Sequence, residues 1–544
     1  MEFFFHARFK KAGRIIFTHP ESFILLIHRS SITMFSTFLP KSSSSAKIIT
    51  PQANMSAENA LLIDDFVNIT MDTDGVEQSA LSTKITPRHD TIGLDAPQKS
   101  TQFCTTVTAR SLPEDDESAR APIDIVVALD VSGSMSGRKL DLCKDTLALL
   151  LRELGSDDRF GLVTFGDEAT LQIPTRKLTK ANKESALAKI KSLHTAGCTN
   201  LSGGIGLAAH ELHSVESPHE VRTIFLLTDG LANRGIADRQ GIENLTKSCL
   251  GASADSRPVA IHCFGYGTDH DHEMLGDISK ATEGGSYCFV DKDSDVSSAF
   301  GDALGGVLSV VAQNTFVRIK VPLEASELGV SILHVKHDKA EKQPDGSYKI
   351  AIGDFYAEES RDIIVETSLA RKGLAVNVPH MTVSLSYLDT VNKKLETSSD
   401  VIGSIARPDG NEVSKTNSHV ALQCIRVRTT EVITETEALA ESGQLAKARS
   451  SIGAYINNLQ QEAAQMEETT NPLIVQFQSE LHTILSGLSS RAEYNATGAK
   501  YMHSRFQTHT MQRCTEASAD SVNAYRSSKK AAMASKMKSD GKLY

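Results

Sequence analysis

The stretch "IDIVVALDVSGSMSG", residues 123–137, places a continuous apolar run directly before a loop rich in hydroxyl and carboxylate side chains. Such a run is typical of a strand that is buried on both faces of a parallel sheet. The loop then presents Asp130, Ser132 and Ser134 at alternate positions. Residues two apart on an extended segment point to the same side, so their oxygens can converge. The stretch therefore predicts a ligand site at the carboxyl end of a parallel strand.

Short apolar runs and longer amphipathic ones alternate on either side of this loop. The expected strands are 123–129, 160–165, 223–228, 259–266 and 286–290, and the expected helices are 138–154, 183–193, 203–213 and 293–311. This alternation predicts an α/β domain over residues 120–311, with a doubly wound, mainly parallel sheet. Ligands of such sheets bind at the carboxyl ends of strands, where the strand order reverses.

Three chemistries can be compared at residues 129–137. A phosphate-binding loop needs G-x-x-x-x-G-K-[ST], but Gly137 is followed by Arg138, Lys139 and Leu140. A hydrolase elbow needs G-x-S-x-G, but Met135 stands where the serine would be. A hard divalent cation such as Mg²⁺ does fit, because it prefers oxygen ligands and few carboxylates.

Two later loops offer further oxygens for such an ion. "TAGCTNLSGG" supplies Thr199 ahead of a helix, and "TIFLLTDG" ends its strand with Asp229. The plainer interpretation is that Ser132 and Ser134 cap the next helix and that Asp229 opens a turn, which such residues commonly do.

Taken together, the order D-x-S-x-S, then G-x-T-N, then a strand ending in T-D-G resembles the von Willebrand factor type A domain and its metal-ion-dependent adhesion site. The resemblance implies that Ser132 and Ser134 bind Mg²⁺ or Mn²⁺ directly, and that Thr199 binds directly or through water. It implies that Asp130 and Asp229 hold coordinating waters. Cys198 departs from the glycine that many relatives have before the threonine.

A metal ion with mostly outer-shell carboxylates keeps an open position, which an Asp or Glu of a partner protein can fill. We therefore expect a non-enzymatic, cation-dependent protein-interaction module or adaptor. One alternative is an adaptor of an AAA+ ATPase or chelatase-type complex. Another is a metal-dependent hydrolase, which would also need a general base near the ion.

The segment "TDHDHE", residues 268–273, invites a second interpretation as a metal site or an acid–base pair. Its candidate groups are Asp269, His270, Asp271, His272 and Glu273. Residues two apart do not share a helix face, and Asp271 suits a helix N-cap with Glu273 at the positive helix end. We therefore expect a structural role.

Beyond residue 312 the pattern changes to strands of alternating polarity, which predict a β-sandwich over residues 312–412. The strand-like pieces 79–87 and 101–113, within 78–119, have no other sheet to join. We expect them to complete the sandwich, so that the α/β domain is an insertion within it.

Residues 413–544 are expected to form an α-helical domain with a disordered basic tail. Gly443 is expected just after a helix end, and Pro472 at a helix start. The arrangement resembles cytosolic von Willebrand A proteins of plants, algae and protists, whose helical (Vwaint-like) region carries a Q-R element, here Gln512-Arg513. Some relatives are ubiquitin ligases, but the cysteines needed for a RING are not paired here.

Overall composition limits the remaining possibilities. The chain has 544 residues and a net charge of −10, which argues against a dedicated nucleic-acid partner. Its eight cysteines include no C-x-x-C pair, and no apolar run is long enough for a membrane span. Residues 1–54 are basic and are expected to be a disordered or targeting extension, followed by a linker over 55–77. We expect a cytoplasmic protein, or an organellar one if residues 1–54 are a transit peptide.

Overall fold

The computed structural model describes residues 14–16, 22–28, 31–37, 79–113, 120–229, 232–251, 259–267, 270–290, 296–370, 377–513 and 524–540. The chain divides into two units, Met1–Glu77 and Gln78–Tyr544. In the first unit, β1 (Arg14–Ile16), β2 (Ser22–His28) and β3 (Ser31–Thr37) form an antiparallel sheet. The rest of the expected extension and the linker over 55–77 lie outside the described residues.

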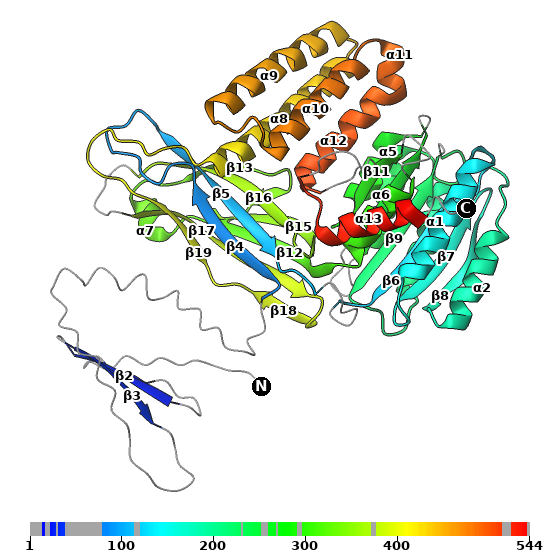
Figure 1. Cartoon of the computed structure of the whole chain (residues 1–544), viewed down its shortest axis with the longest axis horizontal. Helices are drawn as coiled ribbons and strands as arrows, with labels where there is room; N and C mark the ends of the chain where they lie inside the picture. The colour runs from blue at the N-terminus through cyan, green and yellow to red at the C-terminus, as the bar shows by residue number, and fades with distance from the viewer. Residues whose placement is uncertain are drawn as a thin grey trace. The chain divides into compact units, whose positions relative to one another are not determined.

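A six-stranded sheet of order β11-β10-β9-β6-β7-β8 forms the α/β domain of the second unit (Figure 1). Its strands are β6 (Ile123–Asp130), β7 (Arg159–Phe165), β8 (Ala169–Lys177), β9 (Val221–Thr228), β10 (Ala260–Tyr266) and β11 (Ser286–Val290). All neighbours pair in parallel except β7 and β8. Because β7 and β9 flank β6 on opposite sides, the strand order reverses at the carboxyl ends of β6 and β9. The predicted mainly parallel sheet is confirmed.

Helices cover both faces of this sheet. They are α1 (Arg138–Glu153), α2 (Lys180–Lys191), α3 (Leu201–His213), α4 (Arg239–Leu250), α5 (His272–Lys280) and α6 (Val296–Val307). One apolar cluster joins the sheet to α1, α2 and α6, and a second joins it to α3, α4 and α5. The expected helix over 293–311 is too long, because Val310 and Val311 already belong to the next strand and pair with the β-sandwich.

Two antiparallel sheets make up the sandwich. One has the order β14-β15-β12-β17-β18, with β19 also on β17, and the other has the order β13-β16-β5-β4. The strands are β4 (Leu81–Pro87), β5 (Ser100–Ala109), β12 (Val310–Lys320), β13 (Ile332–Lys336), β14 (Ala340–Lys342), β15 (Tyr348–Tyr356), β16 (Ser360–Ser368), β17 (Val378–Asp389), β18 (Lys394–Thr397) and β19 (Val401–Ile405), with α7 (Leu323–Glu327) after β12. Since β5 pairs with β16, the α/β domain is inserted between β5 and β12.

The C-terminal region is helical. It contains α8 (Ser418–Glu441), α9 (Leu445–Gln465), α10 (Pro472–Gly487), α11 (Arg491–Glu493), the π-helical turn η6 (Tyr494–Gly498), α12 (Ala499–Met511) and α13 (Ser528–Asp540). Gly443 has a φ of 80° directly after the C-cap of α8, and Pro472 is in the first turn of α10, as predicted.

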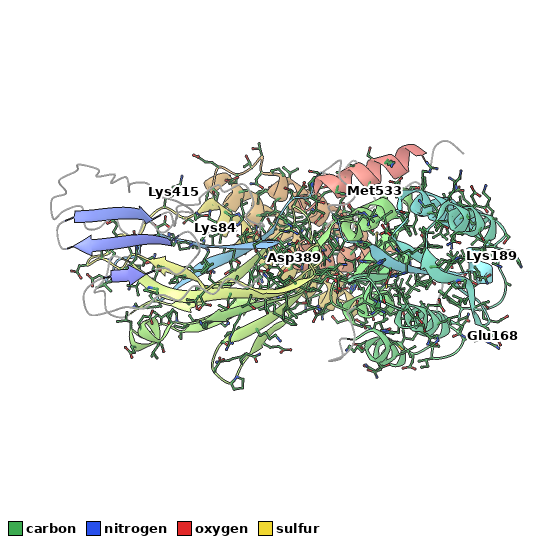
Figure 2. All side chains as sticks on the ribbon, turned by 90° about the horizontal axis from the view of Figure 1, so that it is seen from below. Lys84, Glu168, Lys189, Asp389, Lys415 and Met533 are labelled. Atoms are coloured by element: carbon green, nitrogen blue, oxygen red, sulfur yellow. The ribbon has the colours of Figure 1, made fainter. Side chains whose placement is uncertain are left out.

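The basic tail differs from the disorder expected for it, because α12 and α13 are helices with buried side chains. Met533, labelled in Figure 2, and Met537 of α13 belong to the apolar cluster that contains Phe300 of α6. A Cβ added at Gly301 of α6 would lie 2.8 Å from the Cα of Ala534, so the glycine allows the two helices to pack closely. The basic residues are paired as well, since Asp302 binds Arg526 and Lys530.

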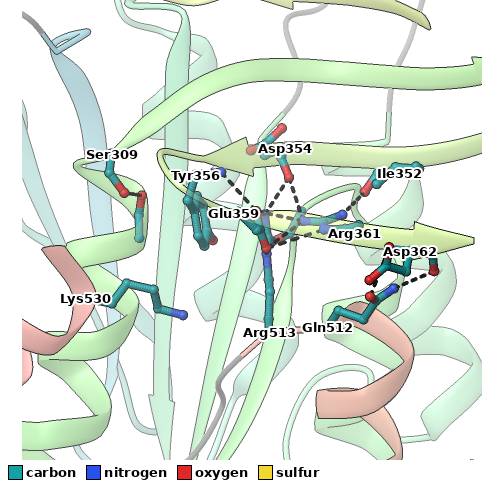
Figure 3. Close-up of polar contacts among 12 residues, drawn as sticks. Ser309, Ile352, Asp354, Tyr356, Glu359, Arg361, Asp362, Gln512, Arg513 and Lys530 are labelled. Atoms are coloured by element: carbon teal, nitrogen blue, oxygen red, sulfur yellow. Dashed lines mark hydrogen bonds and ion pairs between the residues drawn. The ribbon is translucent and has the colours of Figure 1, made fainter. Parts of the chain in front are cut away.

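The Gln512-Arg513 element joins the C-terminal helices to both other parts of the second unit (Figure 3). Gln512 has a φ of 50° at the end of α12, and its amide bonds both backbone groups of Asp362 at 2.9 Å. The guanidinium of Arg513 donates to Glu359 Oε1 at 2.8 Å and to the carbonyl of Gly284, in the loop before β11, at 3.2 Å. Arg361 contacts the same Glu359 oxygen at 3.2 Å. One buried carboxylate is therefore shared by two buried guanidinium groups.

This network predicts how stability depends on pH. Burial alone would raise the pKa of Glu359, but Arg361 and Arg513 lower it to about 2, against 4.5 for a free glutamate. A carboxylate with a lowered pKa stabilises the fold above its unfolded pKa, and the contribution is lost as the pH falls from 4.5 toward 2. Glu359→Gln should lower the free energy of unfolding at pH 6 by about 3–5 kcal/mol, as expected for one partner of a buried ion pair.

Urea denaturation from pH 6 down to pH 2.5 measures the effect. The difference between the wild type and Glu359→Gln should shrink as the pH falls, whereas Glu435→Gln, which removes an exposed partner of Arg428, should change little at any pH. A difference that stays constant with pH would contradict the assignment to the Glu359 carboxylate.

Candidate metal centre

Asp130, the last residue of β6, is fixed by hydrogen bonds to two neighbouring segments. One carboxylate oxygen accepts the backbone N–H of Ser132 at 2.8 Å, and the other accepts the hydroxyl of Thr228, at the end of β9, at 2.6 Å. The side chain is buried. Its carboxylate therefore has one orientation, held between the two strand ends at which the strand order reverses.

The two serines and Asp229 continue the cluster. A short 3₁₀ turn, η4 (Gly133–Met135), turns Ser134 back toward Ser132, and buried Met135 anchors the turn below. The hydroxyl oxygens of Ser132 and Ser134 lie 3.0 Å apart, and the Ser134 hydroxyl donates to Asp229 Oδ1 at 2.8 Å. Ser134 is exposed, whereas Asp229 is buried. Direct hydrogen bonds thus join four of the five residues that the sequence predicted to meet.

The loop that carries Thr199 reaches this cluster through its backbone. Gly133 donates its N–H to the carbonyl of Gly197 at 3.1 Å, and Thr199 donates its N–H to Asn233 Oδ1 at 2.9 Å. Gly197 has a φ of 78°, and a Cβ there would lie 2.4 Å from the carboxylate of Asp167. The glycine therefore sets the path of the loop.

Cys198, where this sequence departs from the family pattern, is exposed. Its backbone N–H donates to Asp167 Oδ1 at 3.1 Å, and its side chain interacts with the same carboxylate.

Gly204, near the start of α3, allows close packing of this helix on the sheet. A Cβ at Gly204 would lie 2.4 Å from the ring of Phe165, so only a glycine lets α3 approach β7 this closely.

The electrostatics of the cluster favour a bound cation. Burial raises the pKa of Asp130, and the nearby charge of Asp229 raises it further. Lys139, in the first turn of α1, forms an ion pair with Asp229 Oδ2. No role for this lysine was predicted from the sequence, because its contact with Asp229 depends on how α1 packs beside β9. The ammonium group places one positive charge beside two buried carboxylates.

These side chains suit a hard divalent ion, because hydroxyl and carboxylate oxygens from the ends of β6 and β9 meet at one sheet edge. Among the described residues, no sulfur or imidazole group belongs to this hydrogen-bonded cluster. Ser132, Ser134 and Thr199 would supply hydroxyl ligands, and Asp130 and Asp229 would orient waters. When bound, the ion would act as a Lewis acid with a position open to a further oxygen ligand.

The "TDHDHE" segment has the structural role that the sequence analysis expected. Asp271 caps α5 by accepting the N–H of Met274 at 2.9 Å, and Glu273 pairs with Arg239. The imidazole of His270 lies 2.7 Å from both the Gly267 carbonyl and the Tyr287 hydroxyl. Asp269 lies outside the described residues.

Comparison with protein families agrees with this geometry. The model of the von Willebrand factor type A domain matches residues 124–302, and a model described as VWA / Hh protein intein-like matches residues 471–539. Residues 124–302 thus form a von Willebrand factor type A domain. Domains of this family typically mediate protein–protein interaction through a metal-ion-dependent adhesion site, which binds a divalent cation.

Curated relatives match the A domain and its surroundings. E3 ubiquitin-protein ligase WAV3 of Arabidopsis thaliana is 29% identical over 255 residues, which are 46% of this chain and 31% of that protein. The uncharacterized protein YfbK of Escherichia coli is 28% identical over 211 residues, which are 38% of this chain and 36% of that protein. The chain thus spans about a third of the length of these two relatives.

A solved structure shares the larger fold. The von Willebrand factor type A protein from Catenulispora acidiphila superposes with a TM-score of 0.56 at 17% identity, over 74% of this chain and 90% of that one. Among the described residues, no helix is long and apolar enough to cross a membrane.

The pairing of Lys139 with Asp229 yields a prediction about cation affinity. The ammonium group competes with a metal ion for the negative charge of the Asp229 carboxylate. Lys139→Met should therefore raise the affinity for Mg²⁺ or Mn²⁺. A gain of about three- to tenfold corresponds to about 0.7–1.4 kcal/mol, a reasonable size for one partly exposed charge pair. Isothermal titration calorimetry measures it.

Lys144→Met, which removes another lysine of α1 that pairs with exposed Asp141, is the matched control and should leave the affinity unchanged. If Lys139→Met weakened the affinity, the ammonium would have to support the ion site rather than compete with it.

Proposed function

We propose that the A domain is a Mg²⁺- or Mn²⁺-dependent protein-interaction module, with Ser132, Ser134 and Thr199 as metal ligands and Asp130 and Asp229 as holders of coordinating waters. The observation that carries this proposal is the contrast in burial within one hydrogen-bonded cluster. Ser134 is exposed, while both carboxylates are buried beneath it. An ion at the serine oxygens would therefore face solvent on its open side, where an Asp or Glu of a partner can reach it.

Buried outer-shell carboxylates explain why a partner's carboxylate would bind well. Hydrogen bonds from Ser132, Thr228 and Ser134 already engage the oxygens of Asp130 and Asp229. An ion beside them would keep more of its positive charge than one that both carboxylates ligate directly. The incoming carboxylate would supply the missing negative charge, so metal binding and partner binding should be mutually dependent.

A groove next to the cluster offers a surface for the rest of the partner. It begins at Val131, adjacent to Ser132, and its lining includes Asp167, Lys189 and His194. These side chains carry both charge signs. A partner held at the ion by one acidic residue would thus also contact a mixed polar surface.

The alternatives are less well supported by the residues near the cluster. A hydrolase would need a general base beside the ion. Of the candidates in the "TDHDHE" segment, His270 is engaged with Gly267 and Tyr287, and Asp271 caps a helix. An adaptor role for an AAA+ motor remains compatible with the same metal chemistry, because the motor or its client would simply be the partner. We propose a cytoplasmic location, because the seven cysteines within the described residues are free thiols, as a reducing compartment favours.

Affinity capture with the full chain as bait tests the proposal. Lysate of the source cell is divided among Mg²⁺, Mn²⁺ and EDTA, and the bait is wild type, Ser134→Ala or Ser136→Ala. Ser136 is an exposed serine of the same loop that is not part of the cluster, so it is the matched control. A true partner should be retained by wild type and Ser136→Ala in metal, and should fall at least about tenfold with EDTA or Ser134→Ala.

Two further arms separate the alternatives. Adding ATP should release a captured AAA+ motor but should leave an ordinary partner bound. Partners that survive both EDTA and Ser134→Ala would show that the interaction does not use the metal centre, and the proposed function would fail.

A further inference from the structure

A second cluster of metal-ligating side chains lies at the joint between the sandwich and the C-terminal helices. Its members are Cys104 of β5, Asp362 of β16 and His419 in the first turn of α8, with ligand atoms that all lie within 4.8 Å of one another. Cys104 Sγ is 3.2 Å from Asp362 Oδ1 and 3.7 Å from His419 Nε2, and that nitrogen is 3.1 Å from Asp362 Oδ1. Three different ligand types therefore converge on one point.

The fold explains why these residues meet. Cys104 and Thr106 alternate along β5 and so point to the same face, and Asp362 is the direct partner of Thr106 in the β5–β16 ladder. The opposite face of β5 carries Phe103 and Val107 into the sandwich core. Helix α8 packs on the first face and brings its first turn over the cluster, beside a small apolar group that contains Cys104, Ile364 and Val420.

The geometry does not suit a nucleophilic relay. In a Cys–His–Asp relay the thiol and the carboxylate contact different nitrogens of the imidazole. Here both face the same atom, His419 Nε2. Convergence of all three groups on one point is instead the pattern of a metal site.

We propose that Cys104, Asp362 and His419 bind Zn²⁺, at a site separate from the metal centre of the A domain. Tetrahedral zinc with ordinary bond lengths to sulfur, nitrogen and oxygen places its ligand atoms about 3.3–3.6 Å apart. The three observed separations, 3.1, 3.2 and 3.7 Å, lie within a few tenths of an ångström of that range. The side chains thus need only small movements to coordinate the ion.

The fourth ligand can be the Thr106 hydroxyl or water. Thr106 Oγ1 lies 2.5 Å from Asp362 Oδ1 and 3.4 Å from His419 Nε2. His419 is exposed, whereas Cys104 is fully buried, so an ion enters past the histidine.

Charge and ligand softness favour zinc over magnesium here. A thiolate and a carboxylate neutralise one divalent ion, which offsets the cost of partial burial. The first turn of α8 lies beside them, and the positive end of a helix favours both anions. Arg426 and Lys84 are cationic neighbours of His419, so their charges oppose the bound cation. Sulfur and imidazole ligands select Zn²⁺ over Mg²⁺, which prefers an all-oxygen site.

The position of Asp362 gives the ion a structural consequence. Gln512 holds both backbone groups of Asp362 at 2.9 Å (Figure 3). Arg426 of α8 donates to the Asp362 carbonyl at 2.9 Å. A zinc ion on the Asp362 side chain would link β5, β16 and α8 at the residue that already anchors the Gln512-Arg513 element. The ion would therefore stabilise the joint between the sandwich and the helices.

Co²⁺ is the probe that tests the site, because a cobalt–thiolate bond has a charge-transfer absorption that oxygen sites lack. The full chain is titrated with Co²⁺ in excess Mg²⁺, which fills oxygen-rich sites. We expect one equivalent to give the thiolate absorption and the visible bands of tetrahedral cobalt, and Zn²⁺ to abolish both. Cys104→Ser should abolish the absorption, and His419→Gln should weaken Co²⁺ binding at least about tenfold.

Matched controls locate the signal. Cys424→Ser, one cysteine further along α8, and Cys198→Ser, next to the metal centre of the A domain, should both retain it. His419 is exposed, so His419→Gln is the variant to rely on if Cys104→Ser fails to fold. Absence of the absorption in the wild type, its survival in Cys104→Ser, or unchanged affinity in His419→Gln would overturn the proposal.

Discussion

The shared burial of Glu359 between Arg361 and Arg513 is the interaction on which the arrangement of the second unit depends. A buried carboxylate is costly unless its charge is balanced and its oxygens are hydrogen-bonded. Here the balance comes from β16 and from the segment after α12, and the same Arg513 also bonds the carbonyl of Gly284 in the A domain. Removing Glu359 would leave two buried guanidinium groups without the carboxylate that they share. The relative position of the sandwich and the C-terminal helices is therefore set by electrostatics as well as by apolar packing.

The strands of the A domain were predictable because burial on both faces leaves a continuous apolar run, as in β6 and β9. Strand β8 was missed because it is an antiparallel edge strand whose residues are mostly polar and only partly buried. Helix α13 was missed because its sequence is basic and its packing depends on Gly301, Asp302 and Gly305 of α6, more than two hundred residues away. The sequence of α13 alone does not indicate a contact with such a distant helix.

The residues of the candidate metal centre were likewise predictable from the sequence only in part. Asp130, Ser132 and Ser134 are neighbours in sequence, and Asp229 ends the adjacent strand, so a motif and the rule for parallel sheets sufficed to group them. The role of Lys139 depends on how α1 leaves the loop, which spacing alone does not give. Cys104, Asp362 and His419 are separated by 258 and 57 positions and lie on three different elements. Only the register of β5 on β16 and the docking of α8 bring them together.

The two clusters differ in chemistry in a way that would let one chain hold two ions without exchange between them. The A-domain cluster offers hydroxyl and carboxylate oxygens at an exposed sheet edge, where a hard ion can keep waters and accept a partner's ligand. The Cys104 cluster offers sulfur and imidazole beneath a helix, where a softer ion is enclosed by the chain itself. An ion that must remain open to a partner and an ion that must stay in place have opposite requirements for exposure. The separation of ligand types between the two clusters matches that difference.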